Sequence, residues 1–334
     1  MYNQGGYFIK ERIYEIERLY LSKNAFLSEN TKGRLHPDDQ CPMRTDFMRD
    51  RDRIIHSKAF RRLMHKMQVF VAPEGDHYRT RLTHTLEVTQ IGRTIARGMA
   101  LNEDLTEAAC LGHDLGHTPF GHSGERVLNS LCTKGYRHNE QSLRVTDVLE
   151  KLNLTYEVRD GILNHTNGIA NTKEGQIVRL ADRIAYINHD IDDAIRAGIL
   201  KSGDIPKDCI EILGTSHSKR ISTMVSAVIA HGSDGSIGMD EPYGSATDKL
   251  RDFMFEAVYK NPVAKSEDAK VENMLTFVFE YFMKKPEKLP GEYMANIDND
   301  GVETVVCDYI AGMTDRYALS LFEKLFVPKA WQYK

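Results

Sequence analysis

Two imidazoles and two carboxylates in this sequence have the chemistry of ligands for one divalent metal ion. His84 stands alone, His113 and Asp114 are adjacent, and Asp182 lies much further along the chain. Mixed nitrogen and oxygen ligation suits a divalent cation, and two carboxylates would balance its charge. Neighbouring side chains on a helix point about 100° apart, so His113 and Asp114 could contact the same ion. The adjacent His-Asp pair is the stronger part of this signal, because the remaining spacing is loose.

A short segment that starts with this pair is rich in histidine. It reads HDLGHTPFGHSGE over residues 113–125 and places three of the 13 histidines of the chain within ten residues. His122 and Glu125 are three residues apart, so on a helix the carboxylate could orient the imidazole. A histidine held in this way is suited to general acid/base catalysis at a phosphoryl oxygen. The alternative is incidental polarity in the first turn of a helix.

Helical periodicity predicts the elements that must position these side chains. The segments with an apolar residue every three or four positions are 10–21, 83–99, 105–115 and 177–197. In the second segment the apolar stripe extends back to His84, which taken alone would be a hydrogen-bonded core histidine. Asp104 and Glu107 are expected to cap the third segment as a capping box. Another helix is expected to begin near Ser123.

The predicted helix over 177–197 carries polar groups beside its apolar stripe. Asp182, Tyr186 and Asp190 follow one another at intervals of four residues, so they share one face of the helix. This face is either exposed to solvent or forms one wall of a pocket.

Composition excludes several classes of protein. The chain has 334 residues, a formal net charge of -4 and 28% charged residues. This balance excludes a dedicated nucleic-acid coat or a polybasic membrane binder. No apolar run reaches the roughly 18 residues of a membrane span, and the N-terminus lacks the apolar stretch of a signal peptide. We therefore expect a cytoplasmic protein with no membrane partner.

The five cysteines support the same expectation. They are odd in number, scattered along the chain and free of CxxC spacing. Such a distribution is typical of reduced thiols in a cytoplasm, so no disulfide is expected.

Residues 44–68 are densely basic, with aspartates placed between the arginines and lysines. The first interpretation is a solvated helix face that carries salt bridges. The second is an anion site or a subunit interface.

Helical periodicity is common along the chain and strand-like alternation is scarce, which predicts an all-α protein. We find no internal repeat. The glycine- and serine-rich stretch 231–245 is expected to be a loop, and helical periodicity resumes over 302–326. We predict an N-terminal helical extension over residues 1–43, a core over 44–200 and a C-terminal helical region over 201–334 packed on that core.

Several longer strings resemble one known family. They are RTDFMRDRDRIIHSKAFRRL, RTRLTHTLEVTQIGR, LGHDLGHTPFGHSGE, RHNEQSLR, RLADRIAYINHDIDDA and DYIAGMTDRYAL. Together they resemble the HD-domain phosphohydrolases, and more narrowly the deoxynucleoside triphosphate triphosphohydrolases of the dGTPase-like branch. The resemblance covers about Arg44 to Asp193 and part of the C-terminal region. It implies an HD-domain helical fold. It also implies an enzyme that hydrolyses a dNTP to a deoxynucleoside and triphosphate.

The resemblance also implies a role for each matching residue. The implied metal ligands are His84, His113, Asp114 and Asp182. The implied catalytic group is His122, Glu125 and His117, in which His122 acts at the α-phosphate as acid/base or nucleophile and Glu125 assists it. The implied phosphate contacts are Arg81, Arg183 and His117. The implied sugar contacts are Gln68, Val69, Tyr186 and Asp190: Tyr186 would exclude a 2′-hydroxyl by bulk, and Asp190 would accept from the 3′-hydroxyl.

The resemblance implies a cofactor and partners as well. One divalent metal ion is expected, Mn²⁺ or Mg²⁺ first, with Fe, Co, Ni or Zn as alternatives. A dNTP would be the substrate, a second dNTP an activator in some relatives, and the chain a homo-oligomer such as a dimer, tetramer or hexamer.

Two alternatives to this function stay open. One is another HD phosphohydrolase, either a nucleotidase or a phosphodiesterase. The other is a nucleotide sensor or single-stranded nucleic-acid binder without turnover, which the basic segment 44–66 would serve.

Overall fold

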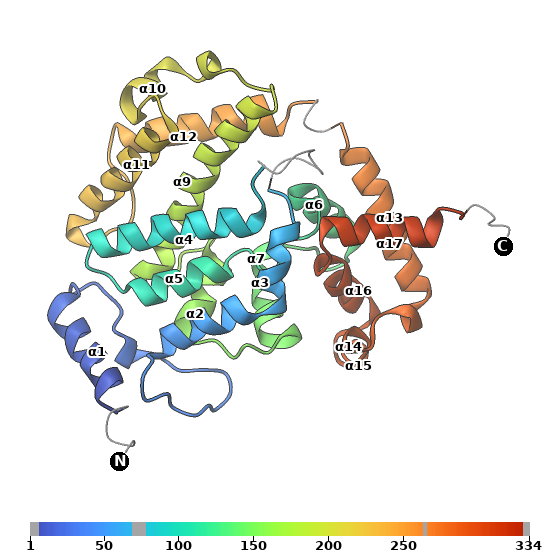
Figure 1. The fold of residues 1–334 in the computed structure, drawn as a ribbon, viewed down its shortest axis with the longest axis horizontal. Helices are drawn as coiled ribbons and strands as arrows, with labels where there is room; N and C mark the ends of the chain where they lie inside the picture. The colour runs from blue at the N-terminus through green and yellow to red at the C-terminus, as the bar shows by residue number, and fades with distance from the viewer. Residues whose placement is uncertain (1–6, 69–77, 263–265, 330–334) are drawn as a thin grey trace.

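The computed structural model describes residues 7–68, 78–262 and 266–329, and within these ranges it contains helices and no β-strand (Figure 1). The predicted all-α fold class is therefore confirmed. The α-helices in chain order are α1 (Tyr7–Tyr20), α2 (Asp46–His56), α3 (Lys58–Arg62), α4 (Arg81–Gly98), α5 (Glu103–Gly112), α6 (Gly121–Leu131), α7 (His138–Arg144), α8 (Tyr156–Asn164), α9 (Lys173–Arg196), α10 (Lys207–Leu213), α11 (His217–His231), α12 (Tyr243–Met254), α13 (Asp268–Lys284), α14 (Gly291–Met294), α15 (Ile297–Asp300), α16 (Val302–Ala311) and α17 (Asp315–Phe326). Two π-helical turns, Val145–Leu149 and Phe255–Tyr259, continue α7 and α12.

Helices α4, α5 and α9 pack against one another at the centre of the molecule. The apolar stripe predicted for α4 is buried here, with Val88 and Ile95 fully inaccessible, and His84 extends it as expected. A capping box fixes the first residue of the helix, because the Thr80 side chain accepts from the Thr83 backbone N–H and the Thr83 side chain accepts in return. The start of α4, and with it His84, is therefore held in place.

Helix α5 begins earlier than the capping pattern predicted. Its N-cap is Asn102, whose side-chain oxygen accepts from the backbone N–H of Leu105 at 3.2 Å. The predicted cap residues Asp104 and Glu107 lie in the first turns instead, 3.6 and 3.5 Å from Nη1 of Arg51 on α2. Asparagine caps a helix as well as aspartate does, so the sequence indicated the right helix and the wrong first residue.

A tight turn connects α5 to α6 and carries the HDLGH residues. Gly116 touches the backbone of α7, since a Cβ built there would lie 2.1 Å from the Ser142 nitrogen. Phe120 adopts a φ of 61°, a left-handed conformation that costs a residue with a side chain about 1–2 kcal/mol. The Asp315 carboxylate holds it there by accepting from the Phe120 backbone N–H at 2.9 Å.

The C-terminal helices pack on the centre in two places (Figure 1). Helices α10, α11 and α12 share a core with α4 and α9, in which Met224, Leu250 and Met254 are fully buried. Helices α13, α16 and α17 share a second core with α6. A third core joins α2, α3, α5 and α8. The loop expected over 231–245 is the connection between α11 and α12.

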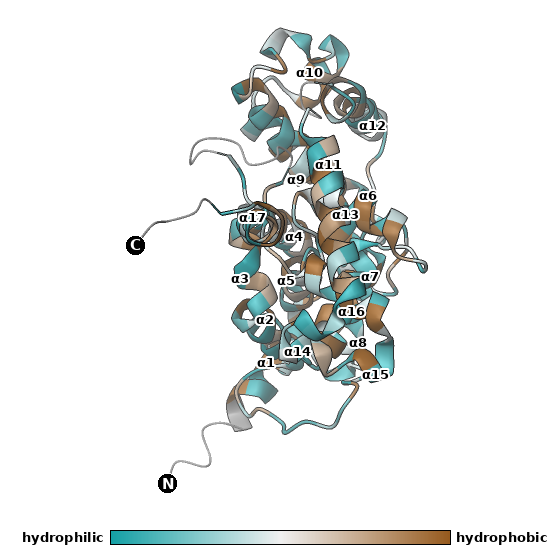
Figure 2. Ribbon diagram, turned by 90° about the vertical axis from the view of Figure 1, so that its right-hand side faces the viewer, coloured by the Kyte–Doolittle hydropathy of each residue, from teal (hydrophilic) through white to brown (hydrophobic). Residues whose placement is uncertain are grey.

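Polar and apolar residues alternate along the helices, and none is apolar over its whole length (Figure 2). Within the described ranges, no helix has the length and apolar character that crossing a membrane requires.

The basic segment 44–68 is for the most part the salt-bridged surface of the first interpretation. Arg44 pairs with Asp52 at 2.7 Å, and Arg49 pairs with Asp38 at 2.8 Å. Lys66 is an exception because only 2% of its surface is exposed.

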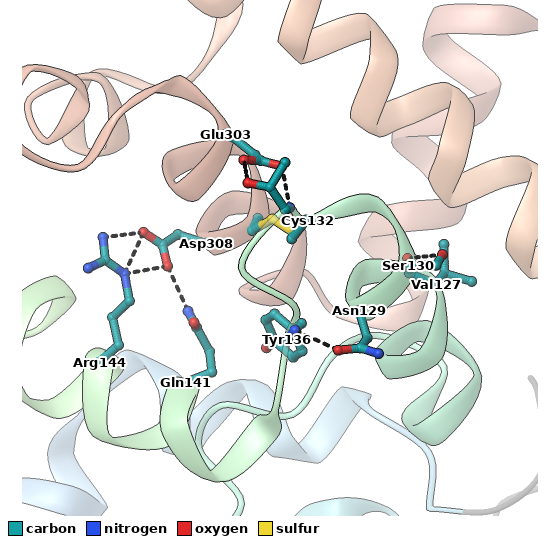
Figure 3. The surroundings of a disulfide bond; sticks show 11 residues. Val127, Asn129, Ser130, Cys132, Tyr136, Gln141, Arg144, Glu303 and Asp308 are labelled. Carbon is teal, nitrogen blue, oxygen red and sulfur yellow. Dashed lines mark hydrogen bonds and ion pairs between the residues drawn. A yellow bond between two sulfur atoms is a disulfide. The ribbon is translucent and has the colours of Figure 1, made fainter.

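The cysteine prediction is wrong for two of the five residues. Cys132 at the end of α6 and Cys307 on α16 form a disulfide that closes 175 residues of chain (Figure 3). Cys41, Cys110 and Cys209 are free. Sequence spacing could not reveal the pair, because only the packing of α6 against the C-terminal helices brings the two residues together.

Candidate active site

The four predicted metal ligands converge from three elements. His84 lies in the first turn of α4, His113 and Asp114 directly follow α5, and Asp182 lies in the middle of α9. His84 Nε2 is 3.1 Å from Asp182 Oδ1, and His113 Nε2 is 3.9 Å from the same oxygen. Asp114 Oδ1 is 3.7 Å from His113 Nε2. The pairing of α4, α5 and α9 therefore brings together residues that are far apart in the sequence.

The donor atoms of this cluster fit a divalent cation. One atom each from His84, His113 and Asp182 lie within 4.8 Å of one another. His113 Nδ1 donates to the Cys110 carbonyl at 2.7 Å, which leaves Nε2 with a free lone pair. That nitrogen is buried and has no hydrogen-bond partner. A buried acceptor without a partner is costly, and a metal ion would satisfy it.

Both carboxylates of the cluster are anionic at neutral pH. Burial would raise the pKa of Asp114, but Arg81 and the surrounding imidazoles outweigh it and hold the pKa well below its ordinary value. Burial acts in the same way on Asp182, where the hydrogen bond to His84 and the nearby His113 outweigh it and lower the pKa to about 2. The cluster therefore carries the negative charge that a divalent cation needs.

Glu125 on α6 is hydrogen-bonded to two imidazoles at once. Its Oε2 lies 3.1 Å from His122 Nδ1, and its Oε1 lies 2.9 Å from His138 Nδ1. Burial would raise the pKa of Glu125, but these two hydrogen bonds outweigh it and lower the pKa strongly. His122 is 67% exposed, so its Nε2 is open to a ligand. The predicted His122–Glu125 pair is formed in the structure.

His138 is a residue to which sequence reasoning gave no role. Burial would lower its pKa, but the hydrogen bond to Glu125 outweighs burial and raises it. Its Nε2 lies 3.2 Å from Nε2 of His165, whose own Nδ1 donates to the Ile162 carbonyl at 2.7 Å. The string RHNEQSLR contains this histidine, but its contact with Glu125 depends on how α7 packs against α6.

His117 lies between the metal cluster and this pair. It is 1% exposed, and its ring stacks on that of His138 at 4.5 Å between centroids. Burial and the nearby Arg81 hold the pKa of His117 well below its ordinary value, so this imidazole is neutral.

Arg81 is the cation of this buried site. Its Nη1 binds Asp114 Oδ2 at 2.8 Å, while Nε and Nη2 are buried without partners. Gln68 Oε1 is also buried without a partner. Both side chains therefore have free hydrogen-bonding groups for a ligand. The predicted residue Val69 lies outside the described residues.

The polar face of α9 is largely buried and is not a solvent face. Asp190 is 3% exposed, and its Oδ1 is buried without a partner. The hydroxyl of Tyr259, at the end of the π-helical turn after α12, donates a short hydrogen bond to Asp190 Oδ2. Burial raises the pKa of Asp190 to about 7 and that of Tyr186 to about 12.

Two further residues come from α12, in a region where the sequence was uninformative. Asp248 pairs with Arg183 at 3.1 Å and with Arg251 at 3.3 Å, and Arg251 is close enough to Tyr186 to affect its ionisation. Together with Tyr259, these residues contact the polar face of α9. No motif marked them, because their position depends on how the C-terminal helices pack.

Known proteins are similar to this chain in sequence and fold. Residues 81–187 match the HD domain family, and residues 237–324 match the phosphohydrolase-associated domain. A solved phosphohydrolase from Bacteroides thetaiotaomicron VPI-5482 superposes with a TM-score of 0.52 at 17% identity, over 82% of this chain and 68% of that one, which supports the fold alone. The fold and the His-Asp cluster define an HD-domain phosphohydrolase.

Two relatives assign the chain to a narrower family. The chain is 56% identical over 330 residues to the deoxyguanosinetriphosphate triphosphohydrolase-like protein of Caldanaerobacter subterraneus subsp. tengcongensis, covering 97% of each chain. It is 49% identical over 339 residues to the protein of the same name from Clostridium tetani, covering 96% of this chain and 97% of the relative. The chain belongs to the deoxyguanosinetriphosphate triphosphohydrolase-like family.

Proposed function

We propose that this protein is a metal-dependent deoxynucleoside triphosphate triphosphohydrolase that converts a dNTP and water to a deoxynucleoside and triphosphate. The observation that carries the proposal is the position of the His122–Glu125 pair beside a His-Asp metal cluster and the unpaired nitrogens of Arg81. The names of the relatives support the same reaction class.

The metal ligands would be His84, His113, Asp114 and Asp182, with Mn²⁺ or Mg²⁺ as the first candidates. A bound divalent ion would lower the pKa of a coordinated water and polarise a phosphoryl oxygen. The chain itself fixes the ligand orientation, because the Cys110 carbonyl holds His113 and Arg81 holds Asp114.

His122 would act as the acid/base group. Glu125 accepts from its Nδ1 and leaves Nε2 directed towards a ligand, where it would protonate the departing 5′-oxygen. His138 keeps Glu125 anionic through a second hydrogen bond. We infer that the carboxylate stabilises the protonated imidazole and fixes its orientation.

Arg81, His117 and Arg183 would bind the phosphates, and Arg251 would extend this set. The free nitrogens of Arg81 suit a phosphoryl oxygen. Arg183 and Arg251 both lie against Asp248, which the triphosphate would displace as their counter-ion.

Asp190 would bind the deoxyribose, since its free Oδ1 can accept from a 3′-hydroxyl. Tyr186 on the same face would exclude a 2′-hydroxyl. The hydroxyl of Tyr259 would fix the rotamer of Asp190. Gln68 has a free buried carbonyl oxygen for the sugar.

Product analysis tests the proposal. The protein is loaded with Mn²⁺ or Mg²⁺ and incubated with each dNTP, with mixed dNTPs and with GTP, and the products are separated. A deoxynucleoside plus intact triphosphate is the expected result, and the mixtures would reveal an activating dNTP. Release of phosphate or pyrophosphate would indicate another HD phosphohydrolase, and no turnover in any mixture would indicate a sensor.

A further inference from the structure

A second cavity lies behind the turn that carries the HDLGH residues. It has a volume of about 60 Å³ and opens between α3, α7 and the following π-helical turn on one side and α14–α16 on the other. We call it the rear pocket and define it by Arg62, Lys66, Leu115, Gln141 and Tyr293. None of the residues assigned to the candidate active site lines it, so it is a separate feature of the molecule.

Two basic side chains of the rear pocket have no carboxylate within ion-pair distance, and burial lowers the pKa of one of them, Lys66, to about 7. Lys66 is 2% exposed, and its ammonium donates to the carbonyls of His117 and Ala311, which leaves one N–H free. The side chain of Arg62 is hydrogen-bonded to the hydroxyl of Tyr293. Among the described residues, no carboxylate oxygen lies within 4.0 Å of either cation, although carboxylates pair with most other arginines nearby.

The cationic groups lie together at one end of the rear pocket. A Cβ built on Gly312 would lie 2.7 Å from the Tyr293 hydroxyl and 3.4 Å from Arg62 Nη1. Lys66 binds the carbonyl of Ala311, the residue directly before Gly312. The guanidinium, the ammonium and the hydroxyl therefore surround one short stretch of backbone.

The acidic residues of the wall are already engaged. Asp308 accepts from Arg144 at 2.7 Å (Figure 3). Glu150 accepts from two backbone N–H groups at the start of α3, at 2.7 and 2.6 Å. Glu292 pairs with Lys58 at the exposed rim. The donor groups of Arg62 and Lys66 are thus not engaged by these carboxylates.

We propose that the rear pocket binds a phosphoryl group between Arg62 and Lys66. A planar guanidinium, an ammonium and a hydroxyl form a donor set that suits a tetrahedral dianion, and a bound dianion would favour the protonated form of the lysine. Leu115, Val145 and Leu149 give the remaining wall an apolar surface. The pocket therefore fits either free phosphate or the phosphate of a small monoester whose organic part contacts that surface.

A bound phosphoryl group would act on the active site through Lys66. This side chain joins the carbonyl of His117, whose imidazole lies in the active site, to the C-terminal helix α16. Gly116, in the same turn, is part of the rear-pocket wall. An anion that draws the ammonium towards it would shift this turn, so occupancy is expected to change the turnover rate. The binding itself does not depend on which reaction the active site performs.

Equilibrium dialysis with ³²P-phosphate tests the site in solution. The full-length protein is used after removal of metal, and wild type is compared with Arg62→Gln, Tyr293→Phe and the control Lys201→Gln, an exposed lysine outside the pocket. We expect Arg62→Gln to weaken one site per chain about tenfold or more and Tyr293→Phe to weaken it less. Lys201→Gln should leave it unchanged. Equal binding by wild type and both pocket variants would overturn the proposal.

Crystals soaked with selenate, a tetrahedral dianion that scatters anomalously, locate the site. An anomalous peak between Arg62 and Lys66 that disappears in Arg62→Gln is expected. Peaks at the active site alone would overturn the assignment.

Phenyl phosphate distinguishes the two sources of the phosphoryl group. Binding at least tenfold tighter than inorganic phosphate would assign the site to a monoester, and equal binding would assign it to free phosphate. Either assignment also requires that the ligand bind more weakly to Arg62→Gln than to wild type.

Discussion

At the scale of single residues, Glu125 connects His122, the proposed acid/base group, to His138. A carboxylate has two oxygens, and each accepts from a different imidazole here. Removing either histidine would leave the other hydrogen bond in place. The metal cluster shares no hydrogen bond with Glu125, so catalysis and metal binding should be separable by mutation.

His122→Ala tests this separation. Activity towards the dNTP should fall by about 10²–10⁴-fold, the usual contribution of a general acid/base group. Metal content, measured by mass spectrometry after reconstitution, should stay at the wild-type level. His36→Ala, an exposed histidine outside the site, is the matched control. Near wild-type activity of His122→Ala would remove His122 from the mechanism.

Asp182→Ala should differ from His122→Ala, because it should lose metal as well as activity. Its Oδ1 lies close to the ring nitrogens of both His84 and His113, so its loss removes the central anionic ligand. We expect both metal content and activity to be lost, while exposed Asp240→Ala retains both. Full metal occupancy in Asp182→Ala would exclude this residue from the ligand set.

At the scale of helices, periodicity predicted the elements well. The helices expected over 83–99, 105–115 and 177–197 are α4, α5 and α9, with ends displaced by a few residues. The polar face of α9, with Asp182, Tyr186 and Asp190, is largely buried and so is not the solvent face that the spacing also allowed. Periodicity gave no information on Tyr259 or Arg251, because their role depends on where the π-helical turn and α12 dock. The contact of Gly116 with α7 likewise needed the structure.

Gly116→Ala tests how strictly the turn after α5 is packed. Its Cβ would meet the backbone nitrogen of Ser142 at 2.1 Å, and backbone cannot yield as a flexible side chain can. We expect a loss of about 2–3 kcal/mol in the free energy of unfolding. Gly203→Ala, where a Cβ meets nothing within 4 Å, should change it little. Equal urea midpoints for the two variants would contradict the close approach.

At the scale of the whole molecule, one buried carboxylate joins three distant segments. Glu174 on α9 accepts at Oε1 from the backbone N–H of Phe26 at 2.9 Å and from that of Asn102 at 3.0 Å. These bonds connect the N-terminal segment, the cap of α5 and the helix that carries Asp182. Its Oε2 is buried without a partner, which an ionised carboxylate tolerates poorly. Burial therefore raises the pKa of Glu174 from 4.5 to about 7.

This raised pKa makes stability depend on pH in a defined direction. Between about pH 4.5 and 7 the folded protein retains a proton that the unfolded chain has lost, so the free energy of unfolding falls as pH rises. The loss from this group reaches about 3 kcal/mol and is complete above pH 7. Glu174→Gln keeps an acceptor for both N–H groups and cannot ionise, so its free energy of unfolding should not show this loss. When the pH is raised from 5 to 8, the difference in the free energy of unfolding between the variant and wild type should shift by about 3 kcal/mol in favour of the variant. Urea unfolding at both pH values measures this shift.

The exposed Glu211→Gln is the control, since it should differ from wild type by the same amount at both pH values. A pH-independent difference between wild type and Glu174→Gln would mean that the carboxylate is ionised in the folded protein. In that case the junction of the N-terminal segment with α5 and α9 would have to contain a compensating donor for Oε2, and the three segments would be joined by a charged group and not by a neutral one.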